Sequence, residues 1–219
     1  MLETKSEEES AKIFMFKFMR TFDPHQEGQV AGKIVGRSLE HLPSRAFPER
    51  DYIHDFIDAW LAELLLAISK SRQMLGTWTG VGLYCWDTYR HAGRVTIFKS
   101  IDKLHSGVGN ELALLWRAQF IHDHLPKCVR PRMNIKRRDN VLQYPDTGSA
   151  IIAATMEGSF PRTFTANGCL DDETAVQQYA EAGYSAIKPL LGPNGRYTAI
   201  STPMGENFWE RLVNDKFDE

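Results

Sequence analysis

The chain has 219 residues and a net charge of −2, with 42% hydrophobic and 25% charged residues. This length fits one large domain, or one and a half small ones, and can bury a substantial core. A net charge of −2 excludes a polycationic protein that binds nucleic acid over its whole surface. The three cysteines are widely spaced, and their spacing matches neither a zinc site nor a disulfide framework.

Hydrophobic spacing and turn residues predict the elements of the first half. The stretch 50–63 places its apolar residues at helical steps, so we expect an amphipathic helix, followed at once by a short apolar strand. In chain order we expect a frayed tail over 1–10, a docked helix or a segment lying on the core over 11–23, a loop-rich segment over 23–50, the amphipathic helix over 50–63, a buried strand over 64–69 and a helix over 77–90.

The second half alternates in the same way. We expect a strand over 93–100, a helix over 102–126 stopped by a proline, a hairpin over 140–155 with its turn at 145–148, a strand over 163–173, a helix over 180–191, a strand over 195–202 and a final helix over 205–215. Alternating strands and helices predict an α/β fold with a mostly parallel central sheet flanked by helices.

Polar residues follow three of these strands where each one ends. They are the stretch from Lys70 to Thr77, the run Asp171-Asp172-Glu173, and the pair Ser201-Thr202. Because ligands bind at the carboxyl ends of strands in open α/β sheets, we expect these three groups to form one site.

The first group resembles half of a phosphate-binding loop, which reads G-x-x-x-x-G-K-[ST]. Thr77 fills the Ser/Thr position, but Gly76 stands in the lysine slot and Leu75 stands in place of the second glycine. A lysine does occur at the front of the stretch, as Lys70. The residues alone leave two readings open: a nucleotide site with a displaced lysine, or an ordinary turn between a strand and a helix.

The acidic group supplies the parts that nucleotide hydrolysis needs beside a phosphate loop. Asp172 at the strand tip would bind Mg²⁺, and Glu173 would orient the attacking water. The alternative without a catalytic role is an acidic helix N-terminus, where the helix dipole favours Asp and Glu. The preceding apolar strand and the loop upstream make the nucleotide site the better interpretation.

Three motifs in this order resemble the ATPase domain of the large terminase subunit of tailed bacteriophages, a DNA-packaging motor. They are "KSRQMLGTW", "LDDETA" and "STPMGENFW", and "MFKFMRTFD", "FPERDYIHDF" and "AIKPLL…GRYTAISTP" extend the resemblance over nearly the whole chain. It implies a P-loop NTPase fold of the ASCE type, in which the working lysine stands at the front of the loop.

The resemblance also implies roles for the residues of the loop. Lys70 would reach the β- and γ-phosphates of ATP, Arg72 would contact the γ-phosphate within the same subunit, and the Thr77 hydroxyl would bind Mg²⁺ together with Asp172. The implied ATP-binding loop is Lys70, Ser71, Arg72, Gln73, Met74, Leu75, Gly76 and Thr77. Leu75 and Gly76 depart from the family pattern, which more often has Gly, Met or Lys at these positions. Leu75 narrows the choice of backbone conformations, because a positive φ is costly for this residue.

Outside the loop, the resemblance makes Arg162 a finger that acts on the ATP of a neighbouring subunit, although a surface ion pair is an equal alternative. Ser201 and Thr202 would couple hydrolysis to movement, or would simply end the strand in a turn into Pro203. Tyr52, with the neighbouring "FP" at 47–48, would line the adenine pocket, or would simply belong to the core. The basic run 127–138, with six basic residues among twelve, would face DNA phosphates or form a solvated loop.

These expectations describe an ATPase core over 51–219, preceded over 1–50 by the tail, the first helix and the loop-rich segment. The implied ligands are ATP and Mg²⁺. The implied partners are double-stranded DNA, the portal protein, the small terminase subunit and further copies of the chain in a ring, expected to be a pentamer, with a monomer in isolation. We expect the host cytoplasm as location and no nuclease activity from this chain. A nucleotide- or DNA-binding assembly module without turnover remains the alternative, followed by an α/β enzyme of unrelated chemistry.

Overall fold

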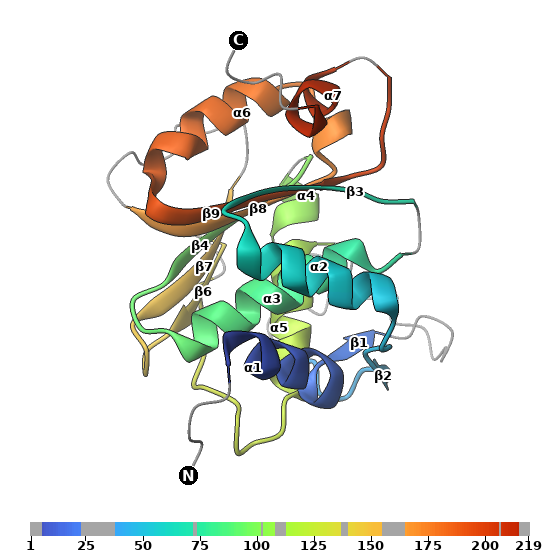
Figure 1. Ribbon diagram of the computed structural model, residues 1–219. Helices are drawn as coiled ribbons and strands as arrows, with labels where there is room; N and C mark the ends of the chain where they lie inside the picture. Colours follow the sequence, from blue (N-terminus) through green and yellow to red (C-terminus); the bar gives the residue numbers. More distant parts are fainter. Residues whose placement is uncertain are drawn as a thin grey trace.

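A computed structural model describes residues 6–22, 38–71, 74–101, 103–107, 113–136, 140–154, 165–205 and 207–214. Within these residues a seven-stranded sheet has the order β3-β9-β8-β4-β7-β6-β5, and a small sheet joins β1 to β2 (Figure 1). The strands are β1 (Arg20–Phe22), β2 (Ser44–Ala46), β3 (Leu65–Ser69), β4 (Val95–Lys99), β5 (Asn134–Lys136), β6 (Val141–Tyr144), β7 (Ser149–Ala154), β8 (Ala166–Asp172) and β9 (Leu191–Ser201).

The large sheet is parallel from β3 to β7 and antiparallel only where β6 and β5 continue it. The predicted α/β class is therefore confirmed. The helical segments are α1 (Glu7–Ile13), the π-helical turn η1 (Phe14–Phe18), α2 (Asp51–Ala62), α3 (Gly76–Arg90), α4 (Lys103–Ser106), α5 (Leu114–His124), the 3-10 turn η2 (Thr174–Val176), α6 (Ala180–Ile187), the 3-10 turn η3 (Lys188–Leu190) and α7 (Phe208–Val213).

Helices cover both faces of the sheet (Figure 1). Successive side chains of a strand point to opposite faces, so β8 sends Leu170 into the core under α2, α3 and α5, and Cys169 into the core under α6 and α7. Ile200 and Ala199 divide in the same way on β9. Burial on both faces explains why these strands read as apolar runs rather than as alternating patterns.

The helix α3 lies against the middle of the sheet because it carries small residues on the side that faces the strands. A methyl group added to Gly80 would come within 2.8 Å of the Ile200 side chain and 2.9 Å of the Leu170 side chain. Gly80, a point of low helix propensity in the sequence, is therefore the place where the helix approaches the sheet most closely.

The amino-terminal segment differs from the expectation in two ways. The described chain is helical from Glu7, because the Ser6 hydroxyl accepts a hydrogen bond from the Glu9 amide at 3.2 Å and three glutamates occupy the first helical turn. Helix α1 then passes into η1, and the predicted helix ends before β1, which pairs with β2 from the loop-rich segment.

Two other predicted helices are shorter than expected. The helix predicted over 102–126 is divided into α4 and α5, because Ala113 adopts an extended backbone at the start of α5. The final helix begins only at Phe208, where the Asn207 side chain caps it by accepting a hydrogen bond from the Trp209 amide at 2.9 Å.

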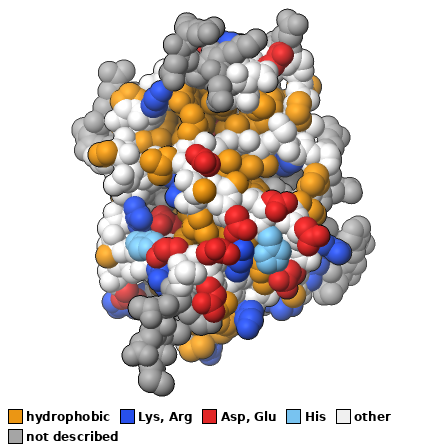
Figure 2. Space-filling view, in the orientation of Figure 1, with side chains coloured by type: hydrophobic (Ala, Val, Ile, Leu, Met, Phe, Trp, Pro, Cys, Tyr) orange, Lys and Arg blue, Asp and Glu red, His pale blue; other side chains and the backbone are white. Residues whose placement is uncertain are grey.

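The strand β3 is not buried as expected but forms one edge of the large sheet. Leu64 and Leu65 expose 45% and 48% of their surface, and Figure 2 shows hydrophobic side chains gathered between β3 and α6. Acidic and basic side chains mix over the face formed by α1 and α2. In the described part of the chain, no helix has the length and apolar character needed to cross a membrane.

Candidate nucleotide-binding site

The ends of three neighbouring strands, β3, β9 and β8, lie side by side at the carboxyl edge of the sheet. The Lys70 amide donates a hydrogen bond to the Ser201 carbonyl at 2.9 Å, and the Glu173 amide donates to the Ile200 carbonyl at 2.7 Å. The chain leaving β9 is thus tied to the chain leaving each of its two neighbours. The structure brings together the three polar groups that follow these strands in the sequence.

Thr77, in the first turn of α3, and Asp172, at the end of β8, are in direct contact. The Thr77 hydroxyl donates to Asp172 Oδ1 at 3.0 Å and lies 3.2 Å from Oδ2. Both residues are buried, and burial raises the pKa of Asp172 to about 6 against the opposing influence of Arg117 and Lys70. One hydroxyl and one carboxylate therefore share a protected position beside the start of a helix.

Lys70 and Glu173 form the second contact of the site. Lys70 Nζ lies 2.8 Å from Glu173 Oε1, and only 11% of the lysine side chain is exposed. Glu173 has φ 57° and ψ 40°, a left-handed conformation that costs an L-residue roughly 1–3 kcal/mol. The chain therefore turns sharply after Asp172, and the two adjacent carboxylates point to different partners.

The connection from β3 to α3 uses a second residue in the left-handed region. Leu75 has φ 55° and ψ 14° at the N-cap of α3, so the leucine adopts the conformation for which it was expected to be poorly suited. Its side chain packs partly against the core, which offsets the backbone cost. The amide end of the 15-residue helix α3 is thereby directed at the site, an arrangement that favours anions.

Gly76 lies against the stem of Lys70. A methyl group added at Gly76 would come within 2.9 Å of Lys70 Cδ. A side chain in the usual lysine position would therefore require the stem of Lys70 to shift. Ser71 is exposed and Met74 is half-buried, whereas Arg72 and Gln73 lie outside the described residues.

The end of β9 contacts the acidic turn through a buried hydroxyl. Ser201 is fully buried, and its Oγ accepts a hydrogen bond from the Ala175 amide at 3.0 Å, just beyond Glu173. Thr202 is half-buried and continues the chain toward Pro203. The Ser201 side chain thus contacts the backbone that follows Glu173.

Helix α2 begins at the end of the sheet where β3 ends and runs back along this strand (Figure 1), and Tyr52 is the second residue of the helix. The Tyr52 side chain is 40% exposed, whereas Phe47 is buried and stacks on Phe16 with ring centroids 6.4 Å apart. The two aromatic residues therefore separate: Phe47 belongs to the core and Tyr52 to the surface. Arg162 lies outside the described residues.

Asp171 has a different environment from its two acidic neighbours. It is fully buried and accepts hydrogen bonds from Lys99 Nζ at 2.7 Å, from Gln177 Nε2 at 2.6 Å and from the Tyr197 hydroxyl at 2.5 Å. Gln177 also donates to the Asp172 carbonyl at 2.9 Å. This buried network fixes the end of β8, and sequence reasoning missed Lys99 and Gln177 because neither belongs to a recognisable motif.

Thr77 and Asp172 fit a magnesium ion by the chemistry of their donors. A hydroxyl and a carboxylate offer the oxygen ligands that Mg²⁺ prefers, and Mg²⁺ usually completes its shell with water and phosphate oxygens. No cluster of three or more histidine, cysteine or acidic residues that could hold a metal occurs in the described segments. An ion held by these two residues would leave coordination positions for water and phosphate oxygens.

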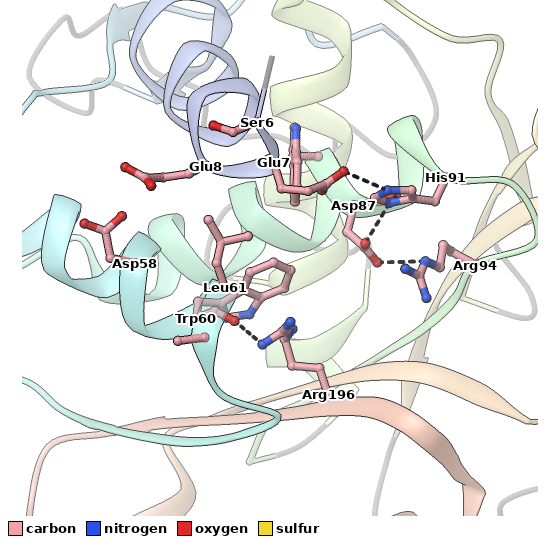
Figure 3. Close-up of a pocket in the computed structure, with 12 residues that line it drawn as sticks. Ser6, Glu7, Glu8, Asp58, Trp60, Leu61, Asp87, His91, Arg94 and Arg196 are labelled. Carbon is pink, nitrogen blue, oxygen red and sulfur yellow. Dashed lines mark hydrogen bonds and ion pairs between the residues drawn. The ribbon is translucent and has the colours of Figure 1, made fainter. Parts of the chain in front are cut away.

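A hollow of about 610 Å³ lies at the other end of α3 (Figure 3). Three of its charged side chains contact one another: His91 Nδ1 lies 3.0 Å from Asp87 Oδ1, and Arg94 Nε lies 3.4 Å from Asp87 Oδ2. Arg196 stacks over the Trp60 ring at 4.2 Å and donates to the Trp60 carbonyl at the end of α2. These contacts join α2, α3 and the sheet, so we assign this hollow no part in the nucleotide site.

The described part of the basic run, 127–136, forms a surface connection whose arginines have acidic partners. Arg130 pairs with Glu40, and Arg132 Nε donates to Asp146 Oδ1 at 2.7 Å. The ion pairs reduce the positive charge that this segment presents to solvent.

No protein-family model matches the chain, and no curated protein matches it in sequence. Solved structures do match its fold. The large terminase of bacteriophage HK97 superimposes with a TM-score of 0.72 at 14% identity, over 96% of this chain and 41% of that protein. The fold is that of a large terminase ATPase domain.

Two further terminase structures share this fold. The large terminase ATPase domain of Thermus phage P74-26 matches with a TM-score of 0.50 at 16% identity, over 66% of this chain and 61% of that one. The large terminase of a thermophilic bacteriophage in complex with ATP-gamma-S matches with a TM-score of 0.55 at 13% identity, over 78% of this chain and 42% of that one. The chain thus spans less than half of the HK97 protein, and the predicted terminase ATPase fold is confirmed.

Proposed function

We propose that this chain is the ATP-hydrolysing motor domain of a viral large terminase, which converts ATP and water to ADP and phosphate. The observation that carries the proposal is the convergence of Lys70, Thr77, Asp172 and Glu173 at the carboxyl ends of adjacent strands. A terminase fold alone would not suffice, because one fold can serve many functions. The related structures with ATP-gamma-S and with ADP support the choice of nucleotide.

The chemistry follows from the contacts of the site. Lys70 and the amides at the start of α3 bind phosphate oxygens. Thr77 and Asp172 would hold Mg²⁺, which when bound would neutralise negative charge on the phosphates. When phosphate takes Lys70 as its partner, Glu173 orients the water and accepts its proton. The water oxygen attacks the γ-phosphorus, the bond from this phosphorus to the β-phosphate oxygen breaks, and ADP leaves.

The proposed motor role extends to movement of double-stranded DNA into the procapsid, with the portal protein, the small terminase subunit and a ring of copies as partners in the host cytoplasm. Coupling would use the end of β9, since the Ser201 hydroxyl contacts the Ala175 amide and the Ser201 carbonyl accepts from the Lys70 amide. A displacement on either side of the site would move the same strand end.

The direct test measures ATP hydrolysis by the wild-type chain, the Lys70→Ala variant and the matched Lys188→Ala variant. Lys188 is exposed and lies over the Tyr184 ring, away from the site. At high protein concentration and with added DNA, turnover should be present in the wild type, persist in Lys188→Ala and vanish in Lys70→Ala. Turnover by Lys70→Ala at the wild-type rate would show that the front lysine does not bind phosphate.

A nucleotide-binding assembly module without turnover is the second candidate, favoured by the left-handed backbone of Leu75 in the loop. One comparison distinguishes the two candidates, carried out at high protein concentration and with added DNA. Binding of ATP-gamma-S without hydrolysis of ATP supports the assembly module. Hydrolysis that depends on Lys70 supports the motor domain.

A further inference from the structure

Arg117 is a cation beside the nucleotide site that no sequence motif indicates. It lies in the second turn of α5, which packs against α3. Its guanidinium carbon is 5.4 Å from the centroid of the Trp78 ring, and Trp78 directly follows Thr77. The guanidinium is therefore held against a side chain of the first turn of α3, and the residue before that side chain is the threonine that donates to Asp172.

The guanidinium has no acceptor of its own among the residues that the structure describes. The Arg117 side chain is not exposed, and its Nε is out of contact with solvent without a hydrogen-bond partner there. Burial lowers the pKa of Arg117, and Asp172 and Glu173 are the two carboxylates whose charge opposes this effect. An arginine nevertheless stays charged in proteins, and a buried charged donor without an acceptor is costly.

The position of Arg117 indicates which anion would satisfy it. Asp172 and Glu173, the two carboxylates near its guanidinium, are the groups proposed to hold Mg²⁺ and to orient water at the γ-phosphorus. A phosphate placed between Lys70 and these carboxylates would be the terminal phosphate of the nucleotide. The planar fork of a guanidinium matches phosphate oxygens with two parallel hydrogen bonds.

We propose that Arg117 contacts the terminal phosphate of ATP within its own subunit and so distinguishes ATP from ADP. This inference rests on the proposed function and adds to it a residue separate from Arg72 in the loop and from Arg162 in a neighbouring subunit. Because ADP lacks the γ-phosphate, the contribution of Arg117 should be confined to the triphosphate.

The test compares equilibrium binding of ATP-gamma-S and of ADP, each with Mg²⁺, to the wild type and to Arg117→Gln. We expect ATP-gamma-S to bind roughly 10- to 100-fold more weakly to the variant, as for a lost hydrogen bond to a charged group, while ADP binds as before. Arg94→Gln is the control, since Arg94 also has a buried Nε without a hydrogen bond but forms an ion pair with Asp87 and lies at the far end of α3.

Other outcomes contradict the proposal. An equal loss for both nucleotides would assign Arg117 a purely structural role on Trp78, and no loss for either would remove it from the site. If Arg117→Gln fails to fold, Arg117→Lys carries the comparison, because lysine keeps the charge and the stem but not the fork. A wild-type chain that binds neither nucleotide would overturn the proposed function itself, and the role of Arg117 with it.

Discussion

Lys70 Nζ lies 2.8 Å from Glu173 Oε1, so the lysine proposed to bind phosphate and the carboxylate proposed to orient water are partners across 103 residues of sequence. A phosphate that binds Lys70 must compete with this ion pair. The pair therefore opposes nucleotide binding and, once replaced by a phosphate, leaves Glu173 available to the water.

We expect Glu173→Gln to separate binding from turnover. Loss of the general base should reduce ATP hydrolysis by roughly 10²- to 10⁴-fold. Binding of ATP-gamma-S should tighten, because the amide competes with phosphate for Lys70 less strongly than the carboxylate does. Glu181→Gln is the control, since Glu181 pairs with Arg211 at the surface and should affect neither quantity. Weaker ATP-gamma-S binding by Glu173→Gln would show that the ion pair does not compete with nucleotide.

Asp172 should impose a pH dependence on stability. Its pKa rises from an ordinary 3.8 to about 6 in the folded chain, so between these values the unfolded chain releases a proton that the folded chain retains. The free energy of unfolding should therefore fall as pH rises from about 4 to about 6, by about 3 kcal/mol in total for this group. Below pH 4 Asp172 is protonated in both the folded and the unfolded chain, so its contribution to the free energy of unfolding no longer changes with pH.

The measurement is urea unfolding of the wild type and of Asp172→Asn across this pH range, in buffer with a chelator that removes divalent cations. Asparagine does not titrate, so the difference between the two proteins isolates Asp172 from the other carboxylates. A difference that stays constant with pH would show that the pKa of Asp172 is not raised.

The alternation of apolar and polar segments was sufficient to predict the α/β class and to place the strand ends at one site. It could not predict the edge position of β3, because Leu65 and Leu66 read as buried whether or not a strand covers them. Nor could it divide the helix predicted over 102–126, since the apolar spacing continues through the extended Ala113.

Local motifs find residues whose neighbours in the chain take part in the same chemistry, as at Lys70 and Thr77. Arg117 and Lys99 have no such neighbours. Arg117 reaches the site only because α5 packs on α3, and Lys99 is a charged residue at the end of an apolar strand. The lysine itself was the signal that could have indicated this network. A charged side chain at the buried end of a strand needs a partner of opposite charge.

The buried pair of Lys99 and Asp171 should be costly to break on one side. Lys99→Met leaves Asp171 as a buried charge without its cation, which typically costs 3–5 kcal/mol, so we expect about this loss in the free energy of unfolding. Lys99→Met combined with Asp171→Asn should be more stable than the single variant, because the amide carries no charge. Arg132→Met, which breaks the exposed pair with Asp146, should cost no more than about 1 kcal/mol.

Denaturant unfolding monitored by circular dichroism gives all of these values. A double variant that is as unstable as Lys99→Met would show that lost packing, and not the isolated charge, is responsible. In either case ATP turnover should fall with the single variant, since the same network holds the backbone of Asp172 through Gln177.

Arg162, which lies ten residues before Asp172, is expected to act on the ATP of a neighbouring copy. An arginine finger contributes roughly 10³ to 10⁵ in rate, so an isolated monomer should be nearly idle and its activity should rise with protein concentration or with motor partners. Mixing two inactive variants tests this directly. Glu173→Ala keeps its finger but cannot activate water, whereas Arg162→Ala keeps a complete site and lacks the finger.

Under assembling conditions the mixture should regain part of the wild-type activity, because Glu173→Ala copies lend Arg162 to the intact sites. Arg132→Ala, a change at an exposed arginine paired with Asp146, should be active without any partner variant. If the mixture stays as inactive as either variant alone while the wild type turns over ATP, Arg162 acts within its own subunit or has a structural role.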